Sequence, residues 1–320
     1  MTPAPSRRLR AGGRVLALGG EHPPALMGVV NASPDSFSDG GRAATTDGQV
    51  ALARELVDAG AAWIDVGGES ASTDRPPVTA EVEMGRVVPV IERVVATTGA
   101  LVCVDTYKPV VAEAAIRAGA VMVNDVSGLR DPELARVCAR TGAALVLMHT
   151  QGPPKSKVLD HPYASVPAEV AGFLAERLAL ARAHGVDPEQ LLLDPGPDFG
   201  KSPAQTVEAL RALADLHALK RPLLLAVSRK DFVGAITGRS PRRRLSGTLA
   251  AVAHGLDAGV HALRVHDVAA VADFLAVRAA LQGTAEVDAD LRLPPELRRE
   301  DGPRPRAPTD ESTTVPPRAD

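Results

Sequence analysis

The sequence is poor in aromatic residues and has no long apolar run. Aromatic side chains make up 2% of its 320 residues, too few for the stacking platforms that bind single-stranded nucleic acid. The net charge of −3 gives no electrostatic reason for a nucleic-acid partner either. No stretch approaches the roughly 20 apolar residues that span a bilayer, and no apolar secretory segment follows the N-terminal arginines. We therefore expect no nucleic-acid or membrane partner, and a cytoplasmic location.

Cysteine is equally scarce, since Cys103 and Cys138 are the only two in the sequence. Two residues are too few for a disulfide scaffold or for a cysteine-based zinc site. Cys103 lies in an apolar run and Cys138 in a helical pattern. Both are predicted to be buried thiols in a reducing compartment.

Short apolar runs alternate with amphipathic stretches between residues 25 and 283, a pattern typical of repeated strand–helix units. The runs are apolar on both faces, as expected for parallel strands inside a ring of helices. Strands are predicted at 25–31, 62–66, 101–105, 121–124, 144–148, 191–194, 223–227 and 262–265. Helices are predicted at 48–59, 79–97, 109–118, 132–140, 167–184, 203–213, 242–258 and 268–281.

Eight such units predict an α/β fold, a (β/α)8 TIM barrel formed by residues 25–283 as a single domain. A doubly wound open sheet is the alternative, but no glycine-rich dinucleotide fingerprint follows the first strand. Residues 1–24 form an N-terminal extension, in which 14–18 could be a strand covering the bottom of the barrel. Residues 284–320 hold seven prolines and alternating charges, so this tail is predicted to be largely disordered.

Polar residues follow every predicted strand, at the end of an α/β barrel where the chemistry lies. They are Asn31, Glu69, Asp105, Asn124, His149, Asp194, Lys230 and His266. Asp131 and Asp267 directly precede predicted helices, where helix capping is the simpler explanation. Capping does not explain a polar residue after all eight strands, so we predict one small-molecule site at this end.

The charges around this predicted site are divided between two groups of strands. Acidic and amide groups follow the middle strands, whereas Lys230, Arg264 and His266 follow the last two. Carboxylates suit a ligand with several N–H donors, such as an aminopyrimidine ring, and the cations suit phosphate or another anion. We therefore expect an acidic wall and a separate cationic wall, holding a donor-rich heterocycle that carries an anion.

Seven short motifs occur in order along the predicted barrel. They are MGVVNASPDSFSDGG (27–41), DVGGES (65–70), VDTYKP (104–109), NDVSG (124–128), LDPGPDFGK (193–201), SRKDFVG (228–234) and RVHDV (264–268). Together they resemble the dihydropteroate synthase family over essentially all of residues 25–283. The resemblance implies a transferase of folate biosynthesis with Mg²⁺ as cofactor. Its small-molecule substrates would be 6-hydroxymethyl-7,8-dihydropterin diphosphate and p-aminobenzoate, which give dihydropteroate and diphosphate.

The resemblance also implies roles for residues at matching positions. The pterin site comprises Asp105, Asn124, Met148, Asp194 and Lys230, although Met148 could equally be ordinary core filling. The diphosphate site comprises Asn31, Arg75, Arg264 and His266, with Asn31 also contacting the metal. The p-aminobenzoate pocket, which sulfonamides occupy in this family, comprises Phe37, Phe199 and Ser228. The catalytic residues would be Asp105, Lys230, Arg264 and His266.

These roles predict a dissociative displacement without a covalent enzyme intermediate. Magnesium, Arg264, His266 and Asn31 would stabilise the leaving diphosphate, and Asp105 the positive charge on the pterin methylene. The aniline nitrogen is already a competent nucleophile, so no strong general base is required. The loop 31–41 is predicted to be a mobile lid, with an ordinary Ω-loop as the alternative.

Three loops depart from the family pattern. Family members read GGESTRPG after the second strand, whereas this chain reads GGESASTDRPPV (67–78), with extra residues before Arg75. The segment 148–163 also differs from the usual methionine-rich version, and Pro197-Asp198 stands where a glycine-rich turn is common.

Because of these departures, two further functions remain open. One is a pterin-binding paralogue without synthase activity, and the other is a methyltetrahydrofolate-dependent methyltransferase barrel. The lid and the cations Lys230, Arg264 and His266 favour a diphosphate substrate over the methyltransferase. Membership of the family further implies a homodimer.

Overall fold

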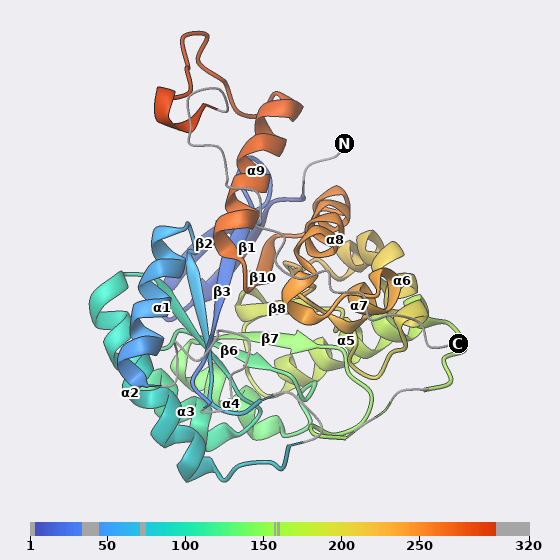
Figure 1. Cartoon of the computed structure of the whole chain (residues 1–320). Helices are drawn as coiled ribbons and strands as arrows, with labels where there is room; N and C mark the ends of the chain where they lie inside the picture. The colour runs from blue at the N-terminus through green and yellow to red at the C-terminus, as the bar shows by residue number, and fades with distance from the viewer. Residues whose placement is uncertain (1–3, 34–44, 71–74, 157, 159–160, 299–320) are drawn as a thin grey trace, which may run out of the picture. The chain divides into compact units, whose positions relative to one another are not determined.

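Eight parallel strands form the closed barrel of this protein, as seen in a computed structural model (Figure 1). The structure describes residues 4–33, 45–70, 75–156, 158 and 161–298. The strands are β3 (Ala25–Asn31), β4 (Trp63–Gly67), β5 (Leu101–Asp105), β6 (Met122–Asp125), β7 (Ala144–Met148), β8 (Leu191–Asp194), β9 (Leu224–Leu225) and β10 (Ala262–Val265). They pair in the order β8-β7-β6-β5-β4-β3-β10-β9, and a single isolated bridge between Leu193 and Leu223 closes the ring. The predicted (β/α)8 barrel is confirmed.

Helices follow the strands and surround the barrel (Figure 1). They are α1 (Thr46–Asp58), α2 (Ala80–Thr98), α3 (Pro109–Arg117), α4 (Pro132–Thr141), α5 (Val166–Ala183), α6 (Pro203–Arg211), α7 (Asp231–Thr237), α8 (Leu245–Asp257) and α9 (Val268–Gln282). Glycines end several of them, as at Gly142, whose φ of 72° is the left-handed conformation that glycine adopts without steric strain. Asp131 caps α4 as predicted, because its side chain accepts a hydrogen bond from the Glu133 amide.

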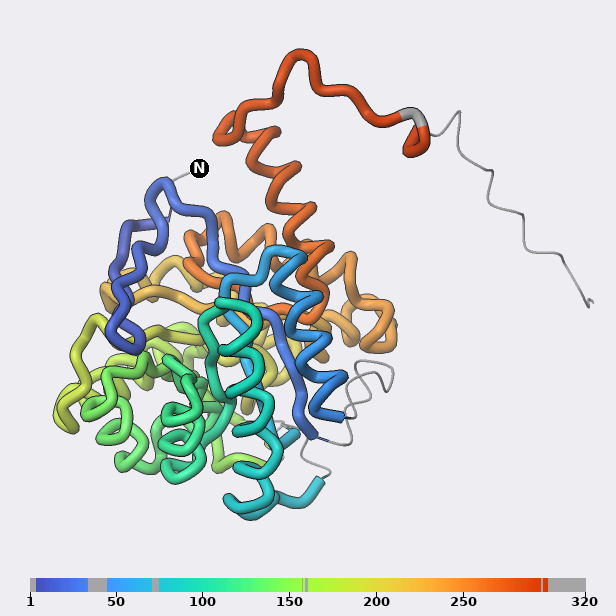
Figure 2. Tube along the Cα trace, turned by 90° about the vertical axis from the view of Figure 1, so that its left-hand side faces the viewer, coloured from blue at the N-terminus to red at the C-terminus, as the bar shows by residue number. Residues whose placement is uncertain are grey.

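The apolar core has two layers, one on each face of the barrel wall. The larger layer fills the space between strands and helices, and the smaller layer fills the barrel interior. An antiparallel hairpin of β1 (Arg7–Ala11) and β2 (Arg14–Leu18) lies against the interior layer (Figure 2). Its Leu9 and Leu18 are buried together with Trp63 and Met122 of the barrel strands. Cys103 and Cys138 are buried and free, as expected.

Some elements differ from the prediction. The strand β1 was not predicted, although its partner β2 has the predicted limits 14–18. The helix α7 was not predicted, because its seven residues are too few to show a helical periodicity and include Gly234. The seventh strand was predicted at 223–227, but β9 has only two residues. The β8–β9 junction is therefore the most thinly paired part of the barrel wall, and the isolated bridge lies there.

The chain divides into two compact units, Met1–Leu275 and Ala276–Asp320. The second unit contains the end of α9 and a short 3-10 helix, Pro295–Leu297. Leu281, Leu291 and Leu297 are exposed in it. The disorder expected for the tail and the boundaries expected for the single domain stay predictions. Among the described residues, none of the helices is both long and apolar enough to cross a membrane.

Candidate active site

The polar strand ends meet at one end of the barrel because the parallel strands are in register. Asn31 pairs with Gly67, Gly67 with Asp105, and Asp105 with Asn124, so these residues lie at one level of the barrel wall. Met148 and Asp194 are paired on β7 and β8. Five strands, β3, β5, β6, β7 and β8, therefore bring predicted site residues to the same end of the barrel.

Arg264 joins the acidic and amide groups at the centre of this end. Its Nε donates to Asp65 Oδ2 at 2.6 Å and its Nη2 donates to Asp105 Oδ2 at 2.9 Å. Asn124 Nδ2 donates to the same Asp65 oxygen at 3.0 Å. The expectation of separate acidic and cationic walls is thus wrong at Arg264, because this guanidinium lies between two carboxylates.

This arrangement perturbs the protonation of Asp105. Burial and the nearby Asp65 carboxylate raise the Asp105 pKa from its ordinary value of 3.8 to about 7, although Arg264 opposes the rise. Burial disfavours the charged form of Arg264, but Asp65 and Asp105 raise the pKa of this residue above its ordinary value. Arg264 is therefore always charged, whereas Asp105 can change charge near neutral pH.

Asp194 is the last residue of β8 and is buried. Its Oδ1 accepts a hydrogen bond from the Gly196 amide at 2.7 Å. Burial raises the pKa of the Asp194 carboxyl, while that hydrogen bond and Lys230 oppose the rise. Met148 is 3% exposed and lies close to Gly196, where an added Cβ would be 3.3 Å from Met148 Cγ. Both residues lie at the ends of their strands, where β7 and β8 are paired.

Lys230 and Phe199 form a cation–aromatic contact on the loops that follow β9 and β8. The Lys230 ammonium is 4.3 Å from the centre of the Phe199 ring. Burial lowers the Lys230 pKa, and the carboxylates of Asp198 and Asp194 oppose this. A second lysine, Lys201, stabilises the loop that follows β8 by donating a hydrogen bond to the Gly196 carbonyl at 2.8 Å.

Ser228 and His266 are joined to each other. The His266 amide donates to Ser228 Oγ, and His266 Nδ1 lies at the same distance of 3.1 Å from that oxygen. Burial, then Arg264 and Arg229, lower the His266 pKa to about 3. His266 is consequently neutral at physiological pH, so it can offer a hydrogen bond to an anion but not the positive charge expected from the sequence.

Asp267 directly precedes α9, and its carboxylate pairs with a cation. Arg229 Nε donates to Asp267 Oδ2 at 3.0 Å and Arg229 Nη2 donates to Oδ1 at 2.5 Å. Asn31 and Arg75 are half-buried. Phe37, most of the predicted lid and the inserted residues 71–74 lie outside the described residues.

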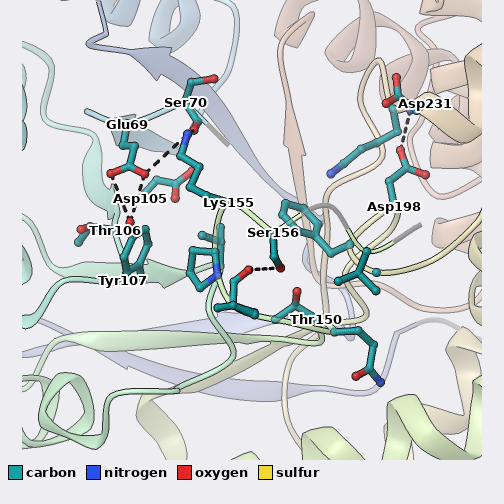
Figure 3. A pocket seen from close by; sticks show the side chains of 18 of the residues that line it. Glu69, Ser70, Asp105, Thr106, Tyr107, Thr150, Lys155, Ser156, Asp198 and Asp231 are labelled. Atoms are coloured by element: carbon teal, nitrogen blue, oxygen red, sulfur yellow. Dashed lines mark hydrogen bonds and ion pairs between the residues drawn. The ribbon is translucent and has the colours of Figure 1, made fainter. Parts of the chain in front are cut away.

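A cavity of about 410 Å³ opens at this end of the barrel (Figure 3). Of the described residues to which the resemblance assigns a role, Asp105, Phe199 and Lys230 line it, and so does Glu69, which follows the second predicted strand. The same wall contains a charge cluster that sequence reasoning missed. There Lys108 donates to Glu69 and to the buried Glu83, at 2.5 Å in both cases.

Lys155 strengthens that wall from the loop after β7. Its ammonium donates to the Ser70 carbonyl and lies 3.7 Å from Glu69 Oε1, and Tyr107 donates to the same carboxylate at 3.1 Å. Glu69 and Tyr107 stand within the quoted motifs, but nothing in the spacing of the sequence indicates that these loops are joined.

Comparisons with known proteins agree on one family. A profile described as pterin binding enzyme matches residues 27–266. The chain is similar to the dihydropteroate synthase of Escherichia coli K12, with 40% identity over 245 residues, which are 77% of this chain and 87% of that protein. It is similar in structure to Xanthomonas albilineans dihydropteroate synthase with 4-aminobenzoic acid, with a TM-score of 0.80, 44% identity, and coverage of 87% of this chain and 99% of that one. A structure of the Xanthomonas albilineans enzyme in complex with 7,8-dihydropteroate gives a TM-score of 0.76 and 43% identity, covering 86% of this chain and 98% of that one.

Proposed function

The chain belongs to the family of pterin-binding enzymes, and we propose that it is a dihydropteroate synthase. It condenses 6-hydroxymethyl-7,8-dihydropterin diphosphate with p-aminobenzoate, and it releases dihydropteroate and diphosphate. The observation that carries this proposal is the placement of Lys230 over the Phe199 ring, at the mouth of a barrel that holds Asp105 and Asp194. A cation and an aromatic face suit an aromatic acid, whereas carboxylates suit a ring with several N–H donors.

The pterin ring occupies the barrel mouth in this proposal. Asp105 and Asp194 accept the N–H groups of its aminopyrimidinone edge, and Asn124 supplies an amide beside them. Met148 packs against the ring, and Lys230 donates to it. Binding of N–H donors favours the charged carboxylate, so ligand binding would lower the raised pKa of Asp105.

Arg264, His266, Asn31 and Arg75 bind the diphosphate. Two donor atoms of Arg264 are engaged by Asp65 and Asp105, and its remaining N–H groups can reach an anion. The neutral His266 contributes a hydrogen bond. These groups stabilise the negative charge that develops on the leaving diphosphate as the C–O bond breaks.

We assign Phe199 and Ser228 to the p-aminobenzoate pocket, with the Lys230 ammonium beside the Phe199 ring. Phe37, which is assigned to the same pocket, lies outside the described residues. The amine nitrogen attacks the pterin methylene, a C–N bond replaces the C–O bond, and the nitrogen then loses its proton to water. Asp105 stabilises the positive charge on the pterin during this step. Covalent attachment to the enzyme and a strong general base are not required.

Magnesium fits this site as a companion of the diphosphate. In the described part of the chain, no group of three or more His, Cys, Asp or Glu residues could hold a metal ion alone. Mg²⁺ commonly keeps several water ligands and is bound through substrate phosphates with few protein groups. The Asn31 amide oxygen would contribute to holding it, and the metal would neutralise charge on the leaving group. The homodimer, the cytoplasmic location and binding of sulfonamides likewise stay predictions.

Diphosphate release tests the proposed function directly. The purified protein is supplied with the pterin diphosphate and Mg²⁺, with and without p-aminobenzoate, and both diphosphate and dihydropteroate are measured. A synthase releases the two products in equal amounts, and only when p-aminobenzoate is present. Pterin binding without release in either condition would instead identify a non-catalytic pterin-binding protein.

A further inference from the structure

Asp198 connects the loop after β8 to the loop after β9. Its Oδ2 accepts a hydrogen bond from the Asp231 amide at 2.6 Å, and its Oδ1 accepts one from the Phe232 amide at 3.3 Å. These amides open α7, and the residue at the cap position, Lys230, makes no side-chain cap. The carboxylate that satisfies the first turn of α7 therefore comes from a different loop (Figure 3).

Asp198 is itself held from the side of α6. Its amide donates to Thr206 Oγ1 at 3.1 Å, and the Thr206 hydroxyl lies 3.3 Å from Asp198 Oδ1, to which it donates. Thr206 is fully buried, so this anchor lies on the packed face of α6. The φ of Asp198 is 66°, a left-handed conformation that favours glycine but is tolerated by aspartate.

The two residues beside this connection are the ones that form the cation–aromatic contact. Phe199 follows Asp198 directly, and Lys230 directly precedes Asp231. Within the described residues, the strands that precede these loops, β8 and β9, are joined by the isolated bridge and its flanking backbone hydrogen bond alone. The barrel wall alone therefore constrains the two loops weakly, and the hydrogen bonds of Asp198 fix them to each other.

We propose that Asp198 is a positioning residue for the second substrate, which sets the distance between the Phe199 ring and the Lys230 ammonium and thereby the affinity for p-aminobenzoate. The inference rests on the proposed function, because it assigns these two side chains to the aromatic acid. Asp198 acts through its neighbours and takes no part in bond making or breaking.

Three variants separate this role from simple stabilisation. D198G removes the carboxylate and accepts the left-handed backbone, whereas D198N keeps one acceptor oxygen and removes the charge. D131G is the matched control, because Asp131 also caps a helix through one side-chain hydrogen bond, to the Glu133 amide at 2.9 Å. Asp131 is exposed and does not line the cavity.

Steady-state diphosphate release gives the first measurement. We expect D198G to raise KM for p-aminobenzoate about tenfold, with kcat changed by less than about threefold, since a lost cap frees both loops. The KM of D198N for p-aminobenzoate should stay within about threefold of the wild-type value, and the KM of D131G should equal the wild-type value. Peptide-level amide hydrogen exchange gives the second measurement. We expect residues 230–237 to exchange about fivefold faster in D198G than in the wild type, and at the wild-type rate in D131G.

Two negative results can be told apart. A wild type that releases no diphosphate in response to p-aminobenzoate overturns the proposed function itself. If the wild type is active but D198G has the same KM and exchange as D131G, Asp198 has no positioning role and only this inference fails.

Discussion

Replacement of Asp105 by asparagine tests how much the charged form of this carboxylate destabilises the folded protein. Asp105 is partly buried, and its Oδ2 accepts a hydrogen bond from Arg264 at 2.9 Å. Asparagine has the same shape and keeps an acceptor for that bond, but it cannot titrate. The difference between wild type and D105N therefore reports the ionisation of Asp105 together with its interactions with the neighbouring buried charges.

The direction of the pKa change determines whether stability rises or falls with pH. Folding raises the Asp105 pKa from 3.8 to about 7, so the native state binds more protons than the unfolded state between these values. The resulting stabilisation is complete below pH 3.8 and is lost as the pH rises to about 7. At 1.36 kcal/mol per pKa unit, it amounts to about 4 kcal/mol, of which about 3 kcal/mol disappears between pH 5 and pH 8.

Urea unfolding of both proteins at pH 5 and pH 8 measures this quantity. From pH 5 to pH 8, we expect the free energy of unfolding of the wild type to fall by about 3 kcal/mol more than that of D105N. This corresponds to a difference of about 1 M in the urea midpoint. Equal losses in the two proteins would refute the reasoning, because Asp105 would then be ionised across the range in the folded state. Bound pterin diphosphate should reduce the difference, since its N–H donors favour the carboxylate.

Three further predictions concern the site and its supports. K230M should lower kcat/KM for diphosphate release about 100-fold, because the ammonium over Phe199 is lost; near-normal rates would contradict its assignment. G196A should lower the free energy of unfolding by more than about 3 kcal/mol in urea, since its Cβ would lie 1.9 Å from the His149 carbonyl oxygen. The control G238A, at a similar φ of 67° but in open space, should lose only about 1 kcal/mol. Excess EDTA should stop diphosphate release and Mg²⁺ restore it; unchanged release in EDTA would exclude a role for the metal.

The fold was predictable because the barrel strands are marked by short apolar runs of the right length. Ala25–Asn31 and Leu101–Asp105 have the predicted limits, since apolar residues give way to polar ones where the strand leaves the core. The same signal fails for β9 and α7. Strand pairing there ends earlier than the apolar run 223–227, and a helix of one or two turns carries no periodic pattern.

The position of the site was predictable, but its internal connections were not. Strand ends identify the residues at the barrel mouth because every parallel strand points its carboxyl end the same way. The pairing of Arg264 with Asp65 joins residues 199 positions apart, and it depends on side-chain reach across the barrel. Asp65 was therefore passed over as a site residue, although it is fully buried and contacts both Arg264 and Asn124.

The hairpin of β1 and β2 has a consequence for how the chain folds during synthesis. Leu9 and Leu18 belong to the same apolar layer as Leu224 and Ala262, so the burial of this hairpin depends partly on strands that are synthesised more than 200 residues later. At about 5–20 residues per second, a ribosome needs on the order of tens of seconds to supply those late strands. During that time the two leucines lack some of their final partners. The first strands of the barrel therefore cannot reach their native packing before the last strands are synthesised.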